Sequence, residues 1–251
     1  MKVKILRQQS PASEPYWETF DYDGSLDNSV AGVLDYINYH DDIAEADGKR
    51  TTRIGWECSC LQGLCGACAM VINGVPALAC ETLVRNLKGD TVEIRPLRKF
   101  PVIHDLIVDR SSIHENLTQT NVFIGEYQPA AADRRSPDSS EPASQAAEPA
   151  IREIAAAEED RAHQYAAAKC LKCGLCLEVC PNYRDGRTFF GAAFANDCYL
   201  VASRNPSKAH AIAKVYSAHF GKDCSKSLSC MDVCPMKIPT IASLAKLNRR
   251  L

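Results

Sequence analysis

The stretch CLKCGLCLEVCP, residues 170–181, places four cysteines and a proline at the spacing C-x2-C-x2-C-x3-C-P. Bacterial ferredoxins bind iron–sulfur clusters with this run, and where two clusters are present the fourth cysteine ligates the other one. Three cysteines at short, equal intervals can wrap one corner of an iron–sulfur cube, while the following helix carries the fourth away. The run therefore predicts half of a two-cluster site and requires a second half elsewhere in the chain.

The second half lies later in the chain, in DCSKSLSCMDVCP, residues 223–235. The shift that carries Cys170 onto Cys224 maps three of the four cysteines onto cysteines and the proline onto Pro235, whereas the second cysteine falls on Ser227. Crossed ligation then assigns a [4Fe–4S] cluster to four thiolates, those of Cys170, Cys173, Cys176 and Cys234. The other cluster is left with three thiolates, those of Cys180, Cys224 and Cys230.

Three thiolates suit a [3Fe–4S] cluster, which is a cube that lacks one iron. The alternative is that the alkoxide of Ser227 binds a fourth iron. An ordinary hydroxyl is much harder to deprotonate than a thiol, whose pKa is about 8.5. The sequence therefore favours the three-iron site.

A third group of cysteines stands in CSCLQGLCGACAMVINGVPALAC, residues 58–80. From Cys60 the spacing is C-x4-C-x2-C-x11-C, and its opening is typical of plant-type [2Fe–2S] ferredoxins. Glycines in this loop allow the backbone to pass close to the sulfides. The predicted ligands are Cys60, Cys65, Cys68 and Cys80. Cys58 would break the spacing and is interpreted as a bystander. A zinc site is the alternative, although structural zinc usually takes two C-x2-C knuckles.

The remaining composition sets the context for these sites. The chain has 13 cysteines among 251 residues. Their odd number and tight clustering without an export signal favour metal ligation over disulfides. No apolar run reaches the length of a membrane helix, which needs about 18 residues or more. Cys198 is expected to be an ordinary buried cysteine of a helix. The six histidines are scattered, and solvated or packing roles are expected for them.

The N-terminal part alternates in the manner of strands at residues 2–7, 16–22 and 91–96. Asn73-Gly74 is a favoured two-residue turn within the predicted hairpin of residues 69–79. Val30, Val33, Leu34 and Ile37 recur at helical spacing, with Asn28 or Ser29 as the cap. Two hairpin-like units around one helix predict a β-grasp domain.

The rest of the chain divides by composition. Residues 128–150 are rich in Ala, Pro and Ser without an apolar period, and we interpret them as a linker or surface insertion. Helical patterns follow from residue 151. The predicted class is α+β: a β-grasp [2Fe–2S] ferredoxin domain at residues 1–105, a connector at 106–150, and an all-α two-cluster ferredoxin domain at 151–251.

Charge follows the same division. Residues 161–251 carry 14 Lys and Arg against 5 Asp and Glu, whereas residues 106–160 carry 4 against 11. The basic C-terminal part fits docking to an acidic partner or anionic lipid, and it equally fits a solvated face that balances anionic clusters.

The three cysteine arrays together, with FPVIHDLIVDRS between them, resemble the iron–sulfur subunit of succinate dehydrogenase and fumarate reductase over nearly the whole chain. The resemblance implies an oxidoreductase subunit that transfers electrons but performs no substrate chemistry, in the tricarboxylic acid cycle or in anaerobic respiration. It implies a flavoprotein partner with FAD, and a membrane anchor that binds a quinone. Electrons would pass through the two-, four- and three-iron clusters in that order.

The resemblance also implies a location at the cytoplasmic face of the cell membrane, peripheral through the anchor. Mitochondrial members carry tryptophans after the C-P pair and a histidine after the next cysteine. The corresponding places here are Asn182, Tyr183, Arg184 and Ser225. This departure favours a bacterial type with a haem-containing, menaquinone-linked anchor. Succinate oxidation and fumarate reduction are both open as the direction of turnover.

Three alternatives compete with this interpretation. The first is a soluble ferredoxin-like carrier, which the basic C-terminal part disfavours. The second is a subunit of a heterodisulfide or thiol-linked reductase, in which the second cysteine run is usually complete. The third is a zinc-binding interaction module.

Overall fold

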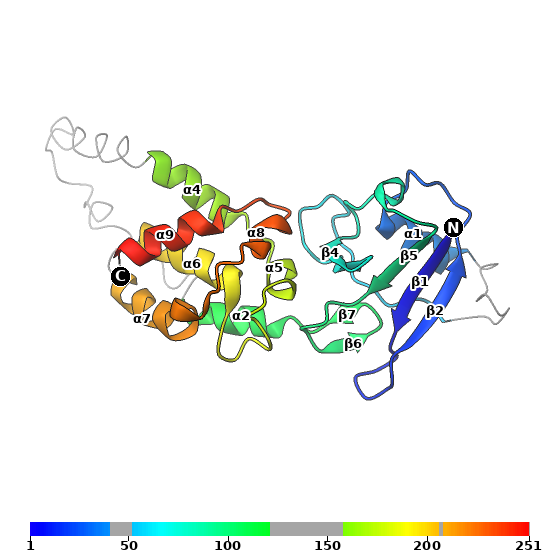
Figure 1. Cartoon of the computed structure of the whole chain (residues 1–251), viewed down its shortest axis with the longest axis horizontal. Coiled ribbons are helices and arrows are strands. Elements are labelled where there is room, and N and C mark those ends of the chain that lie inside the picture. The colour runs from blue at the N-terminus through cyan, green and yellow to red at the C-terminus, as the bar shows by residue number, and fades with distance from the viewer. Residues whose placement is uncertain (41–51, 121–157, 206–207, 251) are drawn as a thin grey trace, which may run out of the picture.

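The computed structural model describes residues 1–40, 52–120, 158–205 and 208–250. A β-sheet part that includes the N-terminus and a helical part lie end to end along the long axis (Figure 1). This architecture confirms the α+β class, with a β-grasp domain followed by an all-α domain. The predicted insertion at 128–150 lies outside the described residues, and the domain boundaries at 105 and 150 stay predictions.

The sheet contains five strands in the order β2-β1-β5-β3-β4. Its first and last strands in the chain, β1 (Lys2–Arg7) and β5 (Thr91–Arg95), pair in parallel at the centre. β2 (Tyr16–Asp21) flanks β1 on one side, and the hairpin of β3 (Ala69–Ile72) and β4 (Val75–Leu78) flanks β5 on the other, all antiparallel. Two hairpin units beside a parallel central pair make the β-grasp topology that the alternation predicted.

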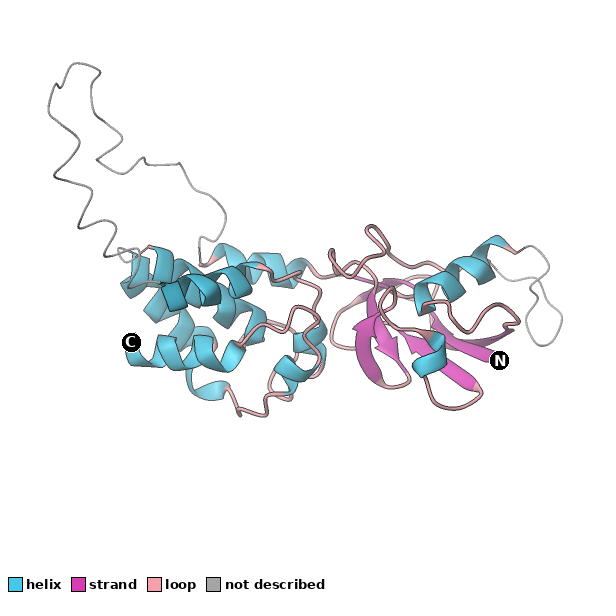
Figure 2. Ribbon diagram, turned by 90° about the horizontal axis from the view of Figure 1, so that it is seen from above, coloured by secondary structure: helices cyan, strands magenta, loops and turns pink. Residues whose placement is uncertain are grey.

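One helix covers this sheet, as the periodicity predicted. α1 (Val30–Tyr39) lies across one face of the strands, and its apolar side joins the buried core (Figure 2). Of the two candidate caps, Ser29 is the one used, because its hydroxyl accepts a hydrogen bond from the Gly32 amide at 3.2 Å. Such a cap satisfies one of the free amide groups at a helix start.

A buried ionic group crosses the same core. The guanidinium of Arg7, fully buried at the end of β1, pairs with Glu18 on β2 and with Asp105, whose Oδ1 lies 3.0 Å from its Nε. Asp105 also accepts a hydrogen bond from the Gly55 amide at 2.8 Å. The group thus fastens the segment before the first cysteine loop to the sheet.

Three short elements that the sequence analysis did not anticipate lead toward the helical part. β6 (Val102–His104) and β7 (Ile107–Val108) form a small antiparallel pair, and α2 (Ser111–Thr118) follows directly. A single 3-10 turn, η1 (Val84–Asn86), lies earlier, before β5. α2 contacts the helical part through α6 and so joins the two parts of the molecule.

The helical part is built around α6 (Gly191–Arg204), which is buried along most of its length. Around it pack α4 (Glu158–Ala168), α5 (Leu175–Glu178), α7 (Ala209–His219) and α9 (Thr240–Arg250). The remaining elements are a 3-10 turn, η4 (Gly221–Asp223), and α8 (Ser229–Asp232). Cys198 on α6 has no exposed surface, which confirms its prediction as a buried helical cysteine.

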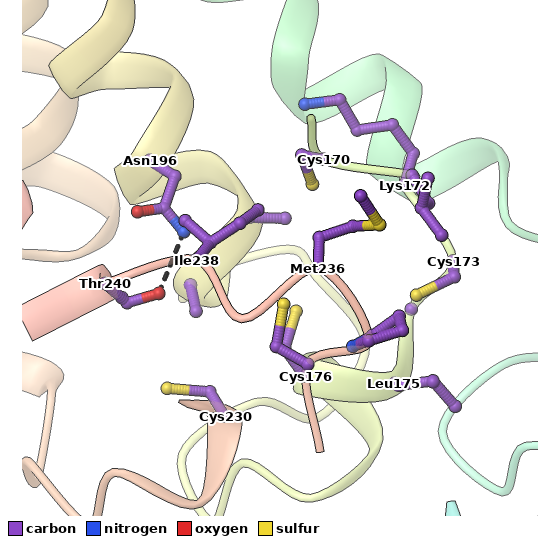
Figure 3. A pocket seen from close by; sticks show the side chains of 16 residues that line it. Cys170, Lys172, Cys173, Leu175, Cys176, Asn196, Cys230, Met236, Ile238 and Thr240 are labelled. Atoms are coloured by element: carbon purple, nitrogen blue, oxygen red, sulfur yellow. Dashed lines mark hydrogen bonds between the residues drawn. The ribbon is translucent and has the colours of Figure 1, made fainter. Parts of the chain in front are cut away.

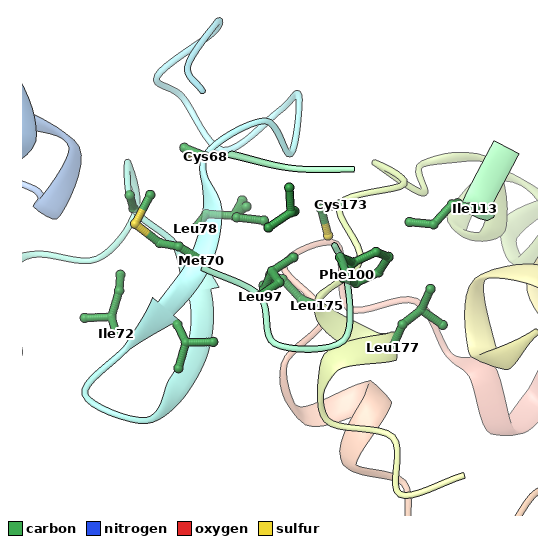
Figure 4. Close-up of a cluster of buried hydrophobic side chains, with 14 of the residues drawn as sticks. Cys68, Met70, Ile72, Leu78, Leu97, Phe100, Ile113, Cys173, Leu175 and Leu177 are labelled. Atoms are coloured by element: carbon green, nitrogen blue, oxygen red, sulfur yellow. The ribbon is translucent and has the colours of Figure 1, made fainter. Parts of the chain in front are cut away.

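The two parts share one hydrophobic cluster at their junction (Figure 4). The sheet part contributes Cys68, Met70, Leu97 and Phe100, and the helical part contributes Cys173, Leu175 and Leu177. Glu178, almost fully buried on α5, accepts hydrogen bonds from the Arg98 side chain at 2.7 Å and from the Lys99 amide at 3.1 Å. The buried apolar side chains and the hydrogen bonds to Glu178 therefore hold the two parts together.

Candidate metal centres

The first cysteine loop lies at the open end of the β3–β4 hairpin. Cys68 directly precedes β3 and Cys80 follows β4, so the antiparallel pairing brings their sulfurs to 3.4 Å. Cys60 lies near Cys65, with which it shares a side-chain hydrogen bond. The four predicted ligands thus fall into two pairs. A two-iron cluster with two bridging sulfides needs two thiolates on each iron, and these pairs fit that demand.

Backbone amides of this loop point at the sulfurs. The amides of Gln62 and Leu64 each donate to Cys60 Sγ at 3.3 Å, and the Gly63 amide donates to Cys80 Sγ at 3.3 Å. The two amide hydrogen bonds to Cys60 lower the pKa of its thiol to about 7. Burial and the neighbouring Cys68 raise the pKa of Cys80 to about 11. Such amides stabilise negative charge on cluster sulfurs, and their number tunes the reduction potential.

The cysteine that the spacing excludes differs from these four in its environment. Cys58 is exposed at the surface, whereas Cys68 is buried and the other three are half-buried. All 13 cysteines fall within the described residues, and each is a free thiol there.

One cavity in the helical part is lined by the four cysteines predicted for the [4Fe–4S] cluster. Cys170, Cys173 and Cys176 come from the first run (Figure 3). Cys234 comes from the second run. Apolar side chains and three residues of α6 complete the wall of this space. Asn196 and Thr240, hydrogen-bonded to each other at 2.9 Å, close its far side.

A second cavity is lined by the three cysteines predicted for the [3Fe–4S] cluster. Cys180 comes from the first run, and Cys224 and Cys230 come from the second. Ser227 lines this same cavity. Cys230 reaches the wall of both cavities, so the two spaces are neighbours.

The backbone repeats along with the sequence. Lys172 and Lys226 are equivalent in the two runs and both have φ 56°, and the equivalent pair Gly174 and Leu228 lies in the left-handed region at φ 86° and 62°. Each pair is followed by a single helical turn, α5 or α8, at the same register. The two runs therefore wrap their cavities in the same way, and the last cysteine of each run, which follows this turn, lines the other run's cavity.

Burial dominates the electrostatics of these cavities. It raises the pKa of the Cys173 and Cys230 thiols to about 11, and that of Cys176 well above its ordinary value. Thiols in such apolar walls need a cationic partner to ionise, and metal coordination deprotonates a thiol outright. The ion pair of Lys172 with the buried Asp197 places a further cation beside Cys170. The donor set and the walls therefore fit an iron–sulfur group.

Within the described residues, no group of three His, Cys, Asp or Glu side chains converges closely enough for a single metal ion. A single tetrahedral ion draws all its ligands to one centre. In a cluster, by contrast, the thiolates bind separate irons and stand farther apart.

The histidines take packing and surface positions, as predicted. His163 is buried and its Nε2 lies 2.9 Å from Ser243 Oγ, while His219 stacks on Phe190 with ring centroids 3.9 Å apart. All six lie in the described residues, and none lines either cysteine cavity.

The two cysteine-bearing regions meet at one point that the sequence analysis missed. A Cβ added to Gly66 would lie 2.7 Å from Cys173 Cβ. Arg110 lies beside this contact and hydrogen-bonds to backbone carbonyls of both regions. A glycine between two predicted ligands was visible in the sequence, but its partner belongs to the other half of the chain and no local pattern reveals it.

Comparison with known proteins agrees with this geometry. Residues 2–115 match the family of the 2Fe-2S iron-sulfur cluster binding domain, and residues 166–238 match the 4Fe-4S dicluster domain. The chain is 30% identical to the succinate dehydrogenase iron-sulfur subunit of Bacillus subtilis (strain 168), over 98% of this chain and 90% of that protein. It is 27% identical to the fumarate reductase iron-sulfur subunit of Haemophilus influenzae, over 97% and 90%.

A solved structure shares the fold along the whole chain. It is the Mycobacterium smegmatis Sdh1 complex in the apo form, which matches with a TM-score of 0.69 at 22% identity. The match covers 99% of this chain and 95% of the other chain.

Proposed function

This chain belongs to the family of succinate dehydrogenase and fumarate reductase iron–sulfur subunits, and from that premise we propose that it relays electrons between FAD in a flavoprotein subunit and a quinone at a membrane anchor. As a member of this family it is a subunit of an oxidoreductase complex. Bound clusters would supply one-electron uptake and release without bond formation. The chain's own residues hold and separate the three sites.

The proposed ligand sets follow the cysteine spacing. The [2Fe–2S] cluster is held by Cys60, Cys65, Cys68 and Cys80, the [4Fe–4S] cluster by Cys170, Cys173, Cys176 and Cys234, and the [3Fe–4S] cluster by Cys180, Cys224 and Cys230. The observation that carries this proposal is the exchange of last cysteines between the two cavities of the helical part. The first cavity is lined by the four cysteines that the repeat assigns to it and also by the neighbouring Cys230, and the second by its three.

The three-iron assignment rests on Ser227. Ser227 lines the cavity of Cys180, Cys224 and Cys230, and it stands at the repeat position that would supply a fourth thiol. Serine keeps its proton at neutral pH, so it adds no anionic ligand there. Cluster type is one determinant of the reduction potential, so a three-iron and a four-iron cluster at this site are expected to differ in potential.

The order of the sites along the molecule supports a relay. The first loop touches the second site at Gly66 and Cys173, and the second and third cavities share the wall at Cys230. The third site lies farthest from the sheet part along the chain of contacts. We assign the flavoprotein to the [2Fe–2S] side and the anchor to the [3Fe–4S] side.

The anchor and quinone proposals rest on sequence and charge. The places next to the third site read Asn182, Tyr183, Arg184 and Ser225, which favours a menaquinone-linked anchor with haem. Among the described residues, no helix combines the length and apolarity that crossing a membrane demands. The proposed location is the cytoplasmic face of the cell membrane, with the anchor as the attachment.

Electron paramagnetic resonance of the complex purified through a tag on this chain tests the function. We expect a [3Fe–4S] signal in the air-oxidised complex, a [2Fe–2S] signal after dithionite, and co-purification of a flavoprotein and a membrane subunit. Succinate should reduce the clusters, and a quinone should reoxidise them. A complex without cluster signals, or a chain that purifies without either partner, would contradict the proposal.

A further inference from the structure

A single arginine fastens the first cysteine loop to the second site. Arg110 lies immediately before α2, and its Nη1 donates to the carbonyl of Gly66 at 3.0 Å. Nη2 donates to the carbonyl of Ala67 at 3.1 Å. Nη1 also reaches the carbonyl of Cys173, at 3.5 Å, across the junction. The planar guanidinium group thus links the segment between Cys65 and Cys68 to Cys173 of the second site.

The charge of this arginine is held largely out of water. Its side chain is 15% exposed, whereas that of its ion-pair partner Glu57 is 42% exposed. The cation therefore lies inward at the junction, and its counter-charge lies outward at the surface. Attraction to an inward negative charge is less screened than attraction at the surface.

We propose that Arg110 is a positioning residue for electron transfer from the first cluster to the second, an inference that rests on the proposed function. Its guanidinium holds the Gly66–Cys173 contact closed through the backbone carbonyls. Its positive charge favours the reduced form of the cluster on either side, because a reduced cluster carries one more negative charge. Arg110 itself gains no electron or proton; the one electron released on one side is taken up on the other.

Three substitutions separate the two roles. Arg110→Met removes the charge and the planar guanidinium group, so the potentials of the [2Fe–2S] and [4Fe–4S] clusters should fall and their magnetic interaction should weaken. Arg110→Lys keeps a charge but replaces the planar guanidinium by a single ammonium group. The magnetic interaction of the two clusters should therefore be affected more strongly than their reduction potentials. Glu57→Gln removes the counter-charge and keeps the clamp, so both potentials should rise with the interaction unchanged.

Redox titration of the purified complex, followed by electron paramagnetic resonance, measures these effects. At a fixed ambient potential we expect the reduced-to-oxidised ratio of the first two clusters to drop about tenfold in Arg110→Met, which corresponds to about 59 mV for a one-electron couple. The [3Fe–4S] cluster, remote from Arg110, serves as the internal control, and its potential should not change. Relaxation of the [2Fe–2S] signal by the reduced [4Fe–4S] cluster reports the interaction.

The outcomes are distinct. If the wild-type complex has all three signals and the variants leave both potentials and the relaxation unchanged, the role of Arg110 is refuted while the proposed function stands. Equal shifts at all three clusters would also refute it. If the complex with Arg110→Met fails to assemble, the Glu57→Gln complex provides the test. Unchanged reduction potentials of the first two clusters in Glu57→Gln would contradict an electrostatic role of Arg110. A wild-type complex without cluster signals overturns the proposed function and this inference together.

Discussion

Gly66 and Cys173 approach so closely that a methyl group on Gly66 would lie 2.7 Å from the Cβ atom of Cys173. Real Cβ atoms do not come that near to each other, so only glycine fits at this point. Gly66 also has a φ of 78°. A side chain is strained in this left-handed region. Two independent demands therefore select the same residue at the junction of the sheet and helical parts.

Gly66→Ala should destabilise the chain and separate the first two sites. We expect about 1 kcal/mol from backbone strain and about 1–3 kcal/mol more from overpacking, together with a weaker magnetic interaction of the clusters. Gly89→Ala is the matched control, because its φ also lies in the left-handed region and no atom lies within 4 Å of the added Cβ. Chemical unfolding and electron paramagnetic resonance measure both effects. Equal losses in the two variants would show that the contact itself carries no cost.

Ser227→Cys should convert the third site to four irons. The new thiolate completes the repeat, and the change of cluster type from three to four irons should lower the reduction potential at that site. Ser225→Cys is the control, because Ser225 lines the same cavity without standing at the repeat position. Iron content and the loss of the oxidised three-iron signal report the conversion. A three-iron signal that persists in a folded Ser227→Cys complex would contradict the alignment of the two cysteine runs.

Exchange of the last cysteines predicts that substitutions act on the distant site. Cys234→Ala should abolish the [4Fe–4S] signal although Cys234 belongs to the second run, and Cys180→Ala should abolish the [3Fe–4S] signal although it belongs to the first. Cys198→Ala controls for the loss of a buried thiol, because Cys198 lines neither cavity. If Cys234→Ala instead abolished the [3Fe–4S] signal and Cys180→Ala abolished the [4Fe–4S] signal, the ligation would be uncrossed.

Arg7→Met should be among the most damaging substitutions in the sheet part. It leaves Glu18 and Asp105 buried without their cation. Such a loss costs about 3–5 kcal/mol in comparable buried pairs. Lys2→Met breaks an ion pair of similar chemistry with Asp21 at the surface. It should cost about 0–1 kcal/mol. Denaturant titration of both variants compares them. A small loss for Arg7→Met would mean that water or a rearranged side chain replaces the guanidinium.

His163 should make the helical part less stable in mild acid. Burial and the nearby Lys246 lower the pKa of His163 below its ordinary 6.5, although Asp160 opposes this. The unfolded chain therefore binds a proton more readily, so the stability present above the ordinary pKa is lost as the pH falls toward the lowered pKa. His163→Gln can keep a hydrogen bond to Ser243 without this titration. Its midpoint of thermal unfolding should fall less than that of the wild type between neutral pH and mild acid, and parallel curves would contradict the assignment.

The features that could be read from the sequence are local ones. Alternation predicted β1 and β5, the Asn73-Gly74 turn predicted the hairpin, and helical spacing with a cap predicted α1. The cysteine spacing also predicted which thiols share a cavity, since the repeat relates two copies of one local wrap. The ligand sets themselves stay predictions.

The features that escaped prediction depend on distant partners. Arg110 and Gly66 are ordinary residues in the sequence, and only folding places them against Cys173. Arg7 ends an alternating strand, and nothing in the local sequence indicates the carboxylates that neutralise it. The pair β6 and β7 is too short to leave a periodic signal.

The sharing of thiols between the two halves of the repeat has a consequence for biogenesis. Neither half contains a complete set of cysteines for its own cavity, so a nascent chain that has emerged only as far as Pro181 holds no finished site in the helical part. If the predicted ligand sets hold, delivery of the four-iron cluster is expected to wait until Cys234 has been synthesised and has folded back across the first run. Neither metal site of the helical part is therefore expected to be filled before the second run has been synthesised.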